Sequence, residues 1–214
     1  MKIQSEFSAV LCLVLTLALT SVAQTTAAPA SATLTPEERE AALRSLQATE
    51  DAFLQSIAGL SEKQWRFKPA PDRWSIAEVS EHIAVSESAI FGMVQSKVMT
   101  SPAAPEKRAE VAGKDEMVLK MVPDRSHKAQ APEFLKPTNR WATQAELIKA
   151  FEDSRKATLD YIRTTNDDLR DHFGPHPLLG SLDAYQWILL ISAHSERHTK
   201  QIEEVKADPN FPKE

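Results

Sequence analysis

Two histidines spaced four residues apart, His194 and His198, lie in a long segment with helical apolar periodicity near the C-terminus. Residues spaced i and i+4 stack on one face of a helix, so the two imidazoles can offer nitrogen atoms to one metal ion. Buried histidines also need hydrogen-bond partners, and a pair of satisfied core histidines is the alternative interpretation. The choice between a metal site and this alternative depends on a third ligand elsewhere in the chain.

Helical periodicity places both histidines in the middle of an apolar stripe, which we expect to face the core. The stripe consists of Trp187, Leu190, Ile191, Ile202 and Val205. The opposite face is charged, and we expect it to be solvated. It carries Glu196, Arg197, Lys200, Glu203 and Glu204.

The third candidate ligand is His82, which lies at the border of the apolar stripe of an earlier helical segment. A border position can face a cleft between helices. Together with His194 and His198 it would provide three neutral nitrogen ligands, and three protein ligands with open positions are typical of a catalytic metal. Zinc is the first expectation, but nickel, iron, copper and manganese stay open because three imidazoles select poorly among these ions.

Three further residues are candidates for a pocket or for positioning the ligands, and none is a convincing general base. Glu50 falls on the inward face of the first helix, where an edge position is favoured over a cavity because an unpaired carboxylate is costly to bury. Glu78 lies one turn before His82 and can either orient it or cap the helix; we favour capping. His176 lies in a Gly- and Pro-containing connector and can rim the mouth of a pocket.

Four long amphipathic segments predict an all-α protein, a four-helix bundle. A bundle places metal sites between facing helices, and no run of residues has the alternation of a strand. A connector of about forty residues separates the second and third helices, and a short helix over 114–121 is predicted within it. The four helices are predicted from Pro36 to Gly59, from Ser75 to about Met99, from Thr143 to about Thr165 and from Asp183 to Ala207.

The composition and the N-terminus restrict the class of protein further. The chain has 214 residues and a net charge of −5, which gives no basic surface for nucleic acid. Lys2, an apolar run over 9–19 and a small-residue cleavage site at 21–23 predict a cleaved export signal over 1–23, and a retained signal anchor is the alternative. The only cysteine, Cys12, lies in this signal. We therefore expect a periplasmic or secreted protein with no stable membrane span after cleavage. The predicted order is a disordered leader over 24–34, a helical domain over 35–207 and a tail over 208–214.

Three stretches of the sequence together have a recognisable order and placement. They are Trp74-Ser75-Ile76-Ala77-Glu78-Val79 before His82, Leu179-Gly180-Ser181-Leu182 with Tyr185-Gln186-Trp187, and His194-Ser195-Glu196-Arg197-His198 with Gln201-Ile202. In these stretches the sequence resembles the DinB-like superfamily of metal-dependent four-helix bundles. In that family one histidine of the second helix and an H-x-x-x-H pair of the last helix bind a divalent metal ion, so the resemblance implies His82, His194 and His198 as ligands.

The resemblance also indicates possible activities. Some relatives are isomerases or transferases that use glutathione, mycothiol or bacillithiol, and the metal would activate the thiol; many others have no known activity. The export signal departs from the cytosolic pattern of the family, and thiols of this kind are chiefly cytosolic. Relatives often form dimers, so a homodimer is a further expectation.

The sequence thus predicts a metal-dependent hydrolase or transferase that acts on a small molecule. Two alternatives stay open. One is a non-catalytic metal- or ligand-binding protein of the cell envelope, and the other is a structural bundle with satisfied histidines.

Overall fold

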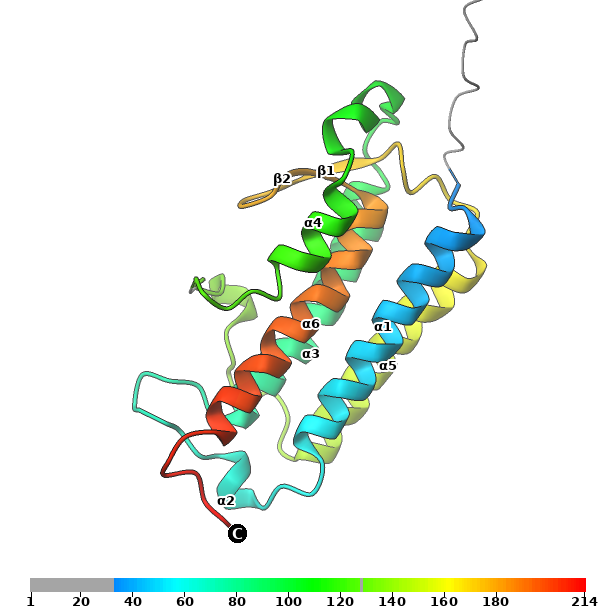
Figure 1. The fold of residues 1–214 in the computed structure, drawn as a ribbon. Coiled ribbons are helices and arrows are strands. Elements are labelled where there is room, and N and C mark those ends of the chain that lie inside the picture. The colour runs from blue at the N-terminus through cyan, green and yellow to red at the C-terminus, as the bar shows by residue number, and fades with distance from the viewer. Residues whose placement is uncertain (1–32, 128) are drawn as a thin grey trace, which may run out of the picture. The chain divides into compact units, whose positions relative to one another are not determined.

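Four long helices, each begun by a reciprocal capping box, form the bundle in the described part of the chain. The computed structural model describes residues 33–127 and 129–214. The helices are α1 (Pro36–Ile57), α3 (Ile76–Met93), α5 (Gln144–Thr164) and α6 (Ala184–Lys206) (Figure 1). At each start the N-cap side chain accepts the backbone N–H of the third helical residue, whose side chain accepts the N-cap N–H. These pairs are Thr35 and Glu38, Ser75 and Glu78, Thr143 and Glu146, and Asp183 and Gln186.

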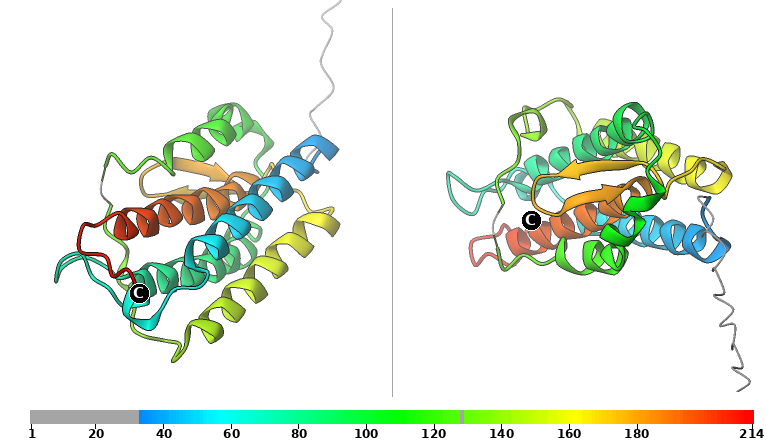
Figure 2. Two further views of the ribbon diagram at one scale, coloured as in Figure 1. Left: turned by 60° about the horizontal axis from the view of Figure 1, so that its bottom comes forward. Right: turned by 90° about the horizontal axis from the view of Figure 1, so that it is seen from above.

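Neighbouring helices run parallel in two pairs, and this arrangement explains the long connector. α1 and α6 run in one direction, and α3 and α5 run in the other (Figures 1 and 2). Accordingly, Lys206 at the end of α6 donates to the carbonyl of Ser56 near the end of α1 at 3.1 Å. A chain that leaves one helix and enters a parallel neighbour must first return along the bundle, which is about 30 Å for a helix of this length.

The connector carries this return and covers part of the bundle. It contains η1 (Val94–Val98), a π-helical turn that directly follows α3, η2 (Pro105–Val111), α4 (Lys114–Met121) and η3 (Glu133–Leu135). The predicted short helix over 114–121 is therefore confirmed as α4, which packs along α6 (Figure 2). The second helix, predicted to continue to about Met99, is regular only to Met93 and then widens into η1.

A small hairpin lies before α6, where no strand is predicted. β1 (Phe173–His176) pairs antiparallel with β2 (Gly180–Asp183). Four residues each are too few to show alternation, and Gly174 and Pro175 hide the strand character. A Cβ at Gly174 would lie 2.9 Å from Val98 Cγ2 and 3.1 Å from Trp187 Nε1, so a glycine permits the close approach of β1 to η1 and α6.

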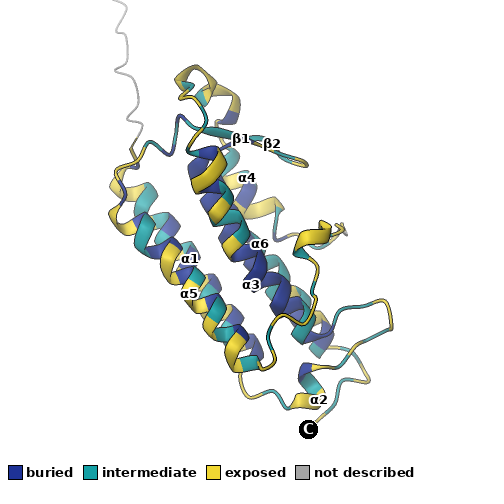
Figure 3. Ribbon diagram, turned by 180° about the vertical axis from the view of Figure 1, so that it is seen from behind, coloured by how far each residue is buried: buried dark blue, intermediate teal, exposed yellow. Residues whose placement is uncertain are grey.

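The first half of α6 is buried on every side. Each residue from 184 to 193 is buried. In Figure 3 the dark blue of buried residues runs along the region where α3 and α6 overlap. One face meets the bundle, where Ser192 accepts a hydrogen bond from Ser45 of α1 at 2.7 Å. Another meets the hairpin, where Trp187 Nε1 donates to the carbonyl of Gly174 at 3.4 Å. The sequence predicts one apolar stripe on α6, but the helix buries two adjoining faces. One face packs against the bundle, and the other packs against α4 and the hairpin.

A layer of polar side chains crosses the middle of the bundle, and each long helix contributes one residue. The layer consists of Thr49 (α1), Glu87 (α3), Arg155 (α5) and Ser195 (α6), all at most 8% exposed. Arg155 Nε and Nη2 donate to the two carboxylate oxygens of Glu87 at 2.6 and 2.8 Å. Its Nη1 donates to Thr49 Oγ1 at 3.0 Å and to the carbonyl of Leu46, and its Nη2 also donates to Ser195 Oγ at 3.1 Å. All three nitrogens of the buried guanidinium thus have partners.

The polar layer separates two apolar clusters of the core. One contains Leu46 and Leu159, and the other contains Phe53 and Phe151, whose rings pack edge to face at 4.6 Å. Because Arg155 lies one helical turn from both Phe151 and Leu159, it occupies a core position of α5. The sequence analysis did not identify this residue.

Several predicted boundaries change or fall outside the described residues. The export signal over 1–23 lies outside them. Leu34, assigned above to a disordered leader, is 7% exposed and packs into the first apolar cluster, because it directly precedes the capped start of α1. In the tail, the ring of Phe211 packs against Phe67 at 5.5 Å. None of the helices in the described residues has the length and apolar character that a membrane crossing requires.

The single variants Arg155→Met and Glu87→Leu are each expected to lower the free energy of unfolding by about 3–5 kcal/mol, because each leaves the other charge buried without its partner. The double variant should recover most of this loss, since apolar side chains of similar size then face each other. Urea unfolding followed by circular dichroism measures the three values.

The matched control is Lys149→Met, which removes an ion pair to Asp153 whose side chains are 73% and 64% exposed. An exposed pair of this kind contributes at most about 1 kcal/mol. If the two core variants lose no more than this control, the buried pair does not constrain the bundle.

Candidate metal centre

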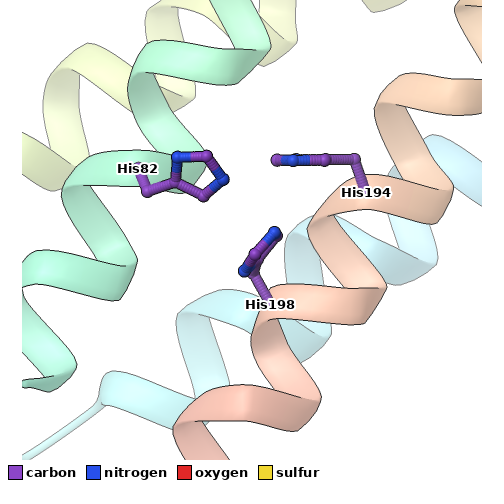
Figure 4. A group of neighbouring side chains, drawn as sticks. All are labelled: His82, His194 and His198. Carbon is purple, nitrogen blue, oxygen red and sulfur yellow. The ribbon is translucent and has the colours of Figure 1, made fainter. Parts of the chain in front are cut away.

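The structure brings the three predicted ligands together between α3 and α6. His82 comes from α3 and His194 and His198 from α6, and one ligand nitrogen of each lies within 4.8 Å of the others. The ring centroids of His198 lie 4.4 Å from those of both His82 and His194, and the latter two are 5.0 Å apart. Figure 4 shows the rings meeting in one space, with α1 and α5 behind them.

The donor set fits a divalent ion that prefers nitrogen ligands. Two nitrogens bound to one tetrahedral zinc ion at about 2.0–2.1 Å are about 3.3 Å apart, so small ring rotations convert the observed spacing into a ligand set. Two of the rings already have partners that fix their tautomer. Nδ1–H of His82 donates to the carbonyl of Leu135 at 2.8 Å, and Nδ1–H of His198 donates to Oε1 of Gln201 at 2.9 Å. Each bond leaves Nε2 with a free lone pair for a metal.

Burial keeps all three imidazoles neutral. Desolvation lowers the pKa of His82, although the hydrogen bond to Leu135 opposes this shift. Desolvation is the largest cause of the lowered pKa of His194, about 3, and repulsion between a second proton and a protonated His82 or the charge of Arg197 adds to it. The pKa of His198 is well below its usual value for the same two reasons. Neutral imidazole is the form that binds a metal ion, so the site is in its ligating state at neutral pH.

His82 is more enclosed than a border position predicts. It is 2% exposed because η3 and the residues after it cover this side of α3. The ring of Trp74 also packs against it at 5.1 Å. The connector thus contributes both the cover and the hydrogen-bond acceptor of this histidine.

A second part of the connector is fixed to α6 by two arginines that periodicity does not identify as part of the site. Arg197 donates to the carbonyls of Val122 at 3.1 Å, His127 at 2.6 Å and Asp124. Because these carbonyls belong to the connector, the face predicted to be solvated is in part an attachment surface.

Arg125 links this attachment to the candidate ligand His198. Its Nε and Nη2 donate to the carboxylate of Glu204 at 2.6 and 2.8 Å, and its Nη1 donates to Gln201 Oε1 at 3.3 Å. Oε1 of Gln201 therefore accepts two hydrogen bonds, one from His198 and one from Arg125. Gln201 could be found from the sequence because it belongs to the motif that contains His194 and His198. Nothing near Arg125 in the sequence shows that this residue contacts α6.

The hydrogen bonds and ion pairs of the two candidate carboxylates are to residues other than the three histidines. Glu78 accepts the N–H of Ser75 at 2.7 Å and pairs with Lys68 at 2.9 Å, so it caps α3 as we favoured. Glu50 is partly exposed and accepts a hydrogen bond from Gln47 at 3.0 Å, in agreement with the edge position. Burial raises the pKa of Glu50, and the charge of Arg155 opposes this shift.

His176, at the end of β1, offers a hydrogen-bond donor. Its Nδ1 accepts the backbone N–H groups of Leu178 and Leu179 at 3.2 and 3.1 Å, so the proton of the neutral ring lies on Nε2. Burial lowers its pKa, and its ring packs against Trp187 at 5.2 Å. His176 lies outside the group of side chains that could hold a metal ion, which in the described residues consists of His82, His194 and His198.

Comparison with known proteins identifies the family. The family model of the DinB superfamily matches residues 45–202, which include all three histidines, and the chain belongs to this superfamily. The uncharacterized protein YuaE of Bacillus subtilis (strain 168) is 28% identical over 150 residues, which cover 70% of this chain and 88% of YuaE. YfiT from Bacillus subtilis is described as a probable metal-dependent hydrolase with an unusual four-helix bundle topology. Its structure matches with a TM-score of 0.54 at 14% identity, covering 84% of this chain and 91% of YfiT. The predicted family and the predicted four-helix bundle are thereby confirmed.

The stability of the metal-free protein should fall as the pH falls from about 6.5 toward 3, the ordinary and the folded-state pKa of His194. In this window the unfolded chain binds a proton at His194 that the folded chain does not bind, so each pH unit costs up to about 1.4 kcal/mol. Above this window both states are neutral and His194 contributes nothing.

Urea unfolding at about pH 7 and about pH 5 measures this slope. His194→Gln, which does not titrate, should have a shallower pH dependence than the wild type. Equal slopes in the two proteins would contradict a depressed pKa at this histidine.

Proposed function

We propose that the protein is a divalent-metal-dependent enzyme, a hydrolase or transferase, that acts on a small molecule. His82, His194 and His198 are its metal ligands in this proposal. The observation that carries it is the meeting of three neutral imidazoles, two of which are oriented by hydrogen bonds on Nδ1. The description of YfiT, which has the same fold, as a probable metal-dependent hydrolase supports it.

The chemistry of the proposed enzyme follows from its donor set. A bound divalent ion with three protein ligands supplies a Lewis acid with open positions. Neutral ligands leave the positive charge of the ion undiminished, which favours an anionic or polarisable substrate group. Zinc is the first candidate, and nickel, iron, copper and manganese fit the same nitrogen donors.

His176 is the group that we assign to substrate orientation. Its Nε2–H is a hydrogen-bond donor fixed by the two backbone N–H groups on Nδ1. Its ring packs at 5.2 Å against Trp187, which lies about two helical turns before His194 on α6. A neutral donor beside a metal site can hold a substrate oxygen without competing for the metal.

One observation favours a second function, a non-catalytic metal- or ligand-binding protein of the cell envelope. The carboxylates considered as bases, Glu50 and Glu78, make their contacts away from the histidines. This second protein would retain its metal tightly and show no turnover. Against it stands the number of ligands: a purely structural metal site usually has four protein ligands, and three are found among the described residues.

The proposed setting follows from the N-terminal sequence and the charge. The signal over 1–23 directs the mature protein to the periplasm or the medium, and no nucleic acid partner is proposed for a chain of charge −5. A homodimer remains part of the proposal through the resemblance to the family.

Metal content tests the site directly. The mature wild-type protein, incubated with zinc, nickel or manganese and dialysed, should retain about one divalent ion per chain in elemental analysis. His194→Ala should retain none, because two imidazoles bind much more weakly than three. His127→Ala is the control, since this histidine is exposed on the connector and should leave the metal content unchanged.

Thermal unfolding and a substrate screen complete the test. Metal at a free concentration of 100 times its Kd should stabilise the wild type by about 2.7 kcal/mol and leave His194→Ala unchanged. Turnover in a screen of hydrolase and thiol-transfer substrates, lost in His194→Ala, would establish the enzyme. Metal retention without turnover would favour the binding protein, and a wild type without metal would contradict both.

A further inference from the structure

The connector segment from Ala131 to Arg140, here called the strap, covers α3 beside the metal centre. It includes η3 and supplies the Leu135 carbonyl that accepts Nδ1–H of His82 at 2.8 Å. All of its residues are described and none is buried: seven are exposed, and Ala131, Leu135 and Pro137 are partly exposed. Side-chain burial therefore contributes little to holding the strap, and its position depends on polar contacts.

Glu81, the residue before His82, makes these contacts. It is 4% exposed. Its Oε1 accepts the backbone N–H of Thr138 at 2.6 Å and the Thr138 hydroxyl at 3.4 Å, and its Oε2 accepts the backbone N–H of Asn139 at 2.9 Å. Nε of Arg140 lies 3.8 Å from Oε1. Hydrogen bonds to an ionised carboxylate are among the strong ones in proteins, so Glu81 is the main attachment of the strap.

The backbone of the strap is shaped to meet this carboxylate. Asn139 has a φ of 59°, a left-handed conformation that is uncommon outside glycine. Two successive N–H groups that point at one anion form a concave anion site, and such a turn persists where its surroundings fix it. Arg140 Nη2 also donates to the carbonyl of Phe134 at 3.1 Å, which ties the end of the strap back to η3.

We propose that Glu81 is a positioning residue for the metal centre and acts on His82 through the strap. The carboxylate fixes Thr138 and Asn139, the strap carries this constraint to Leu135, and the Leu135 carbonyl holds the proton of His82 on Nδ1. Nε2 of His82 then faces His194 and His198. In many metal sites a carboxylate binds the ligand histidine directly; here the neighbouring carboxylate of the same helix does so through a backbone segment. The effect on metal binding rests on the proposed function.

The first variant is Glu81→Gln. The amide keeps the size of the side chain but turns one acceptor into a donor, so one of the two backbone N–H groups loses its partner. We expect the zinc affinity, measured by competition with a chromophoric chelator, to fall about 10–100-fold, the usual effect of losing a residue that orients a ligand. The control is Glu78→Gln, one turn before His82 on the same helix. The carboxylate of Glu78 also accepts a backbone N–H, at 2.7 Å, but its partners are Ser75 and Lys68 and it makes no bond to the strap or to His82. It should lower the melting temperature and leave the zinc affinity unchanged.

The second readout needs no metal. Side-chain ¹⁵N NMR of the histidines in the metal-free protein should show His82 as the Nδ1–H tautomer in the wild type and in Glu78→Gln, and as a mixture of tautomers in Glu81→Gln. If Glu81→Gln does not fold, Thr138→Pro removes both the backbone N–H and the hydroxyl that Thr138 donates to Glu81, leaves the sequence of α3 unchanged and should have the same two effects.

The outcomes separate the two proposals. A single tautomer in Glu81→Gln, or an affinity equal to that of Glu78→Gln, would overturn the positioning role. If the wild type binds no metal, the proposed function fails, while the tautomer of His82 still decides whether Glu81 acts through the strap.

Discussion

The buried guanidinium of Arg155 is the constraint on which the rest of the bundle depends. A charge in the core is tolerated only when nearly all of its hydrogen-bond donors have partners. Here the partners come from the three other long helices, so α1, α3 and α6 can slide or rotate against α5 only by breaking one of these bonds. The same bonds restrict how the helices that carry the three histidines can move. Ser195 directly follows His194 on α6, and Glu87 lies on α3 with His82. We therefore interpret the Arg155–Glu87 pair as a contact that fixes how the helices align along one another, more than as a source of net stability.

The second organising feature is the double burial of α6. Its bundle face carries Ser192 and Ser195, and its other face carries Trp187 and the two ligand histidines. The metal centre therefore lies beside the bundle core, under the connector, and not within the core. This position explains why two groups that position the candidate ligands come from the connector: the carbonyl of Leu135 bonds His82, and Arg125 bonds Gln201, the partner of His198. The long return between parallel helices thus provides the walls of the site as well as the chain connection.

The sequence predicts those features that local physics determines. Capping boxes and apolar periodicity place the helix starts, and the i, i+4 spacing places two candidate ligands on one face. The features that were missed depend on contacts between distant segments. The strap and Arg125 lie in a connector without periodicity, so only the folded chain shows that they reach α3 and α6. Arg155 is a partial exception: its spacing of four residues from both Phe151 and Leu159 marks an inward position, but a charged residue there is interpreted as core only when its partner is known.

The pairing of the first and last long helices has a consequence for how the chain folds. Ser45 meets Ser192 across 147 residues of sequence, and Ser56 meets Lys206 across 150. The central polar layer is incomplete until α6 is present, because a fragment that ends before α6 lacks the bond from Arg155 to Ser195. Folding rates fall as the sequence separation of contacts rises. We therefore expect this bundle to assemble late and as one cooperative unit, more slowly than bundles whose helices pair in chain order, with the metal ligands aligned only in the final step.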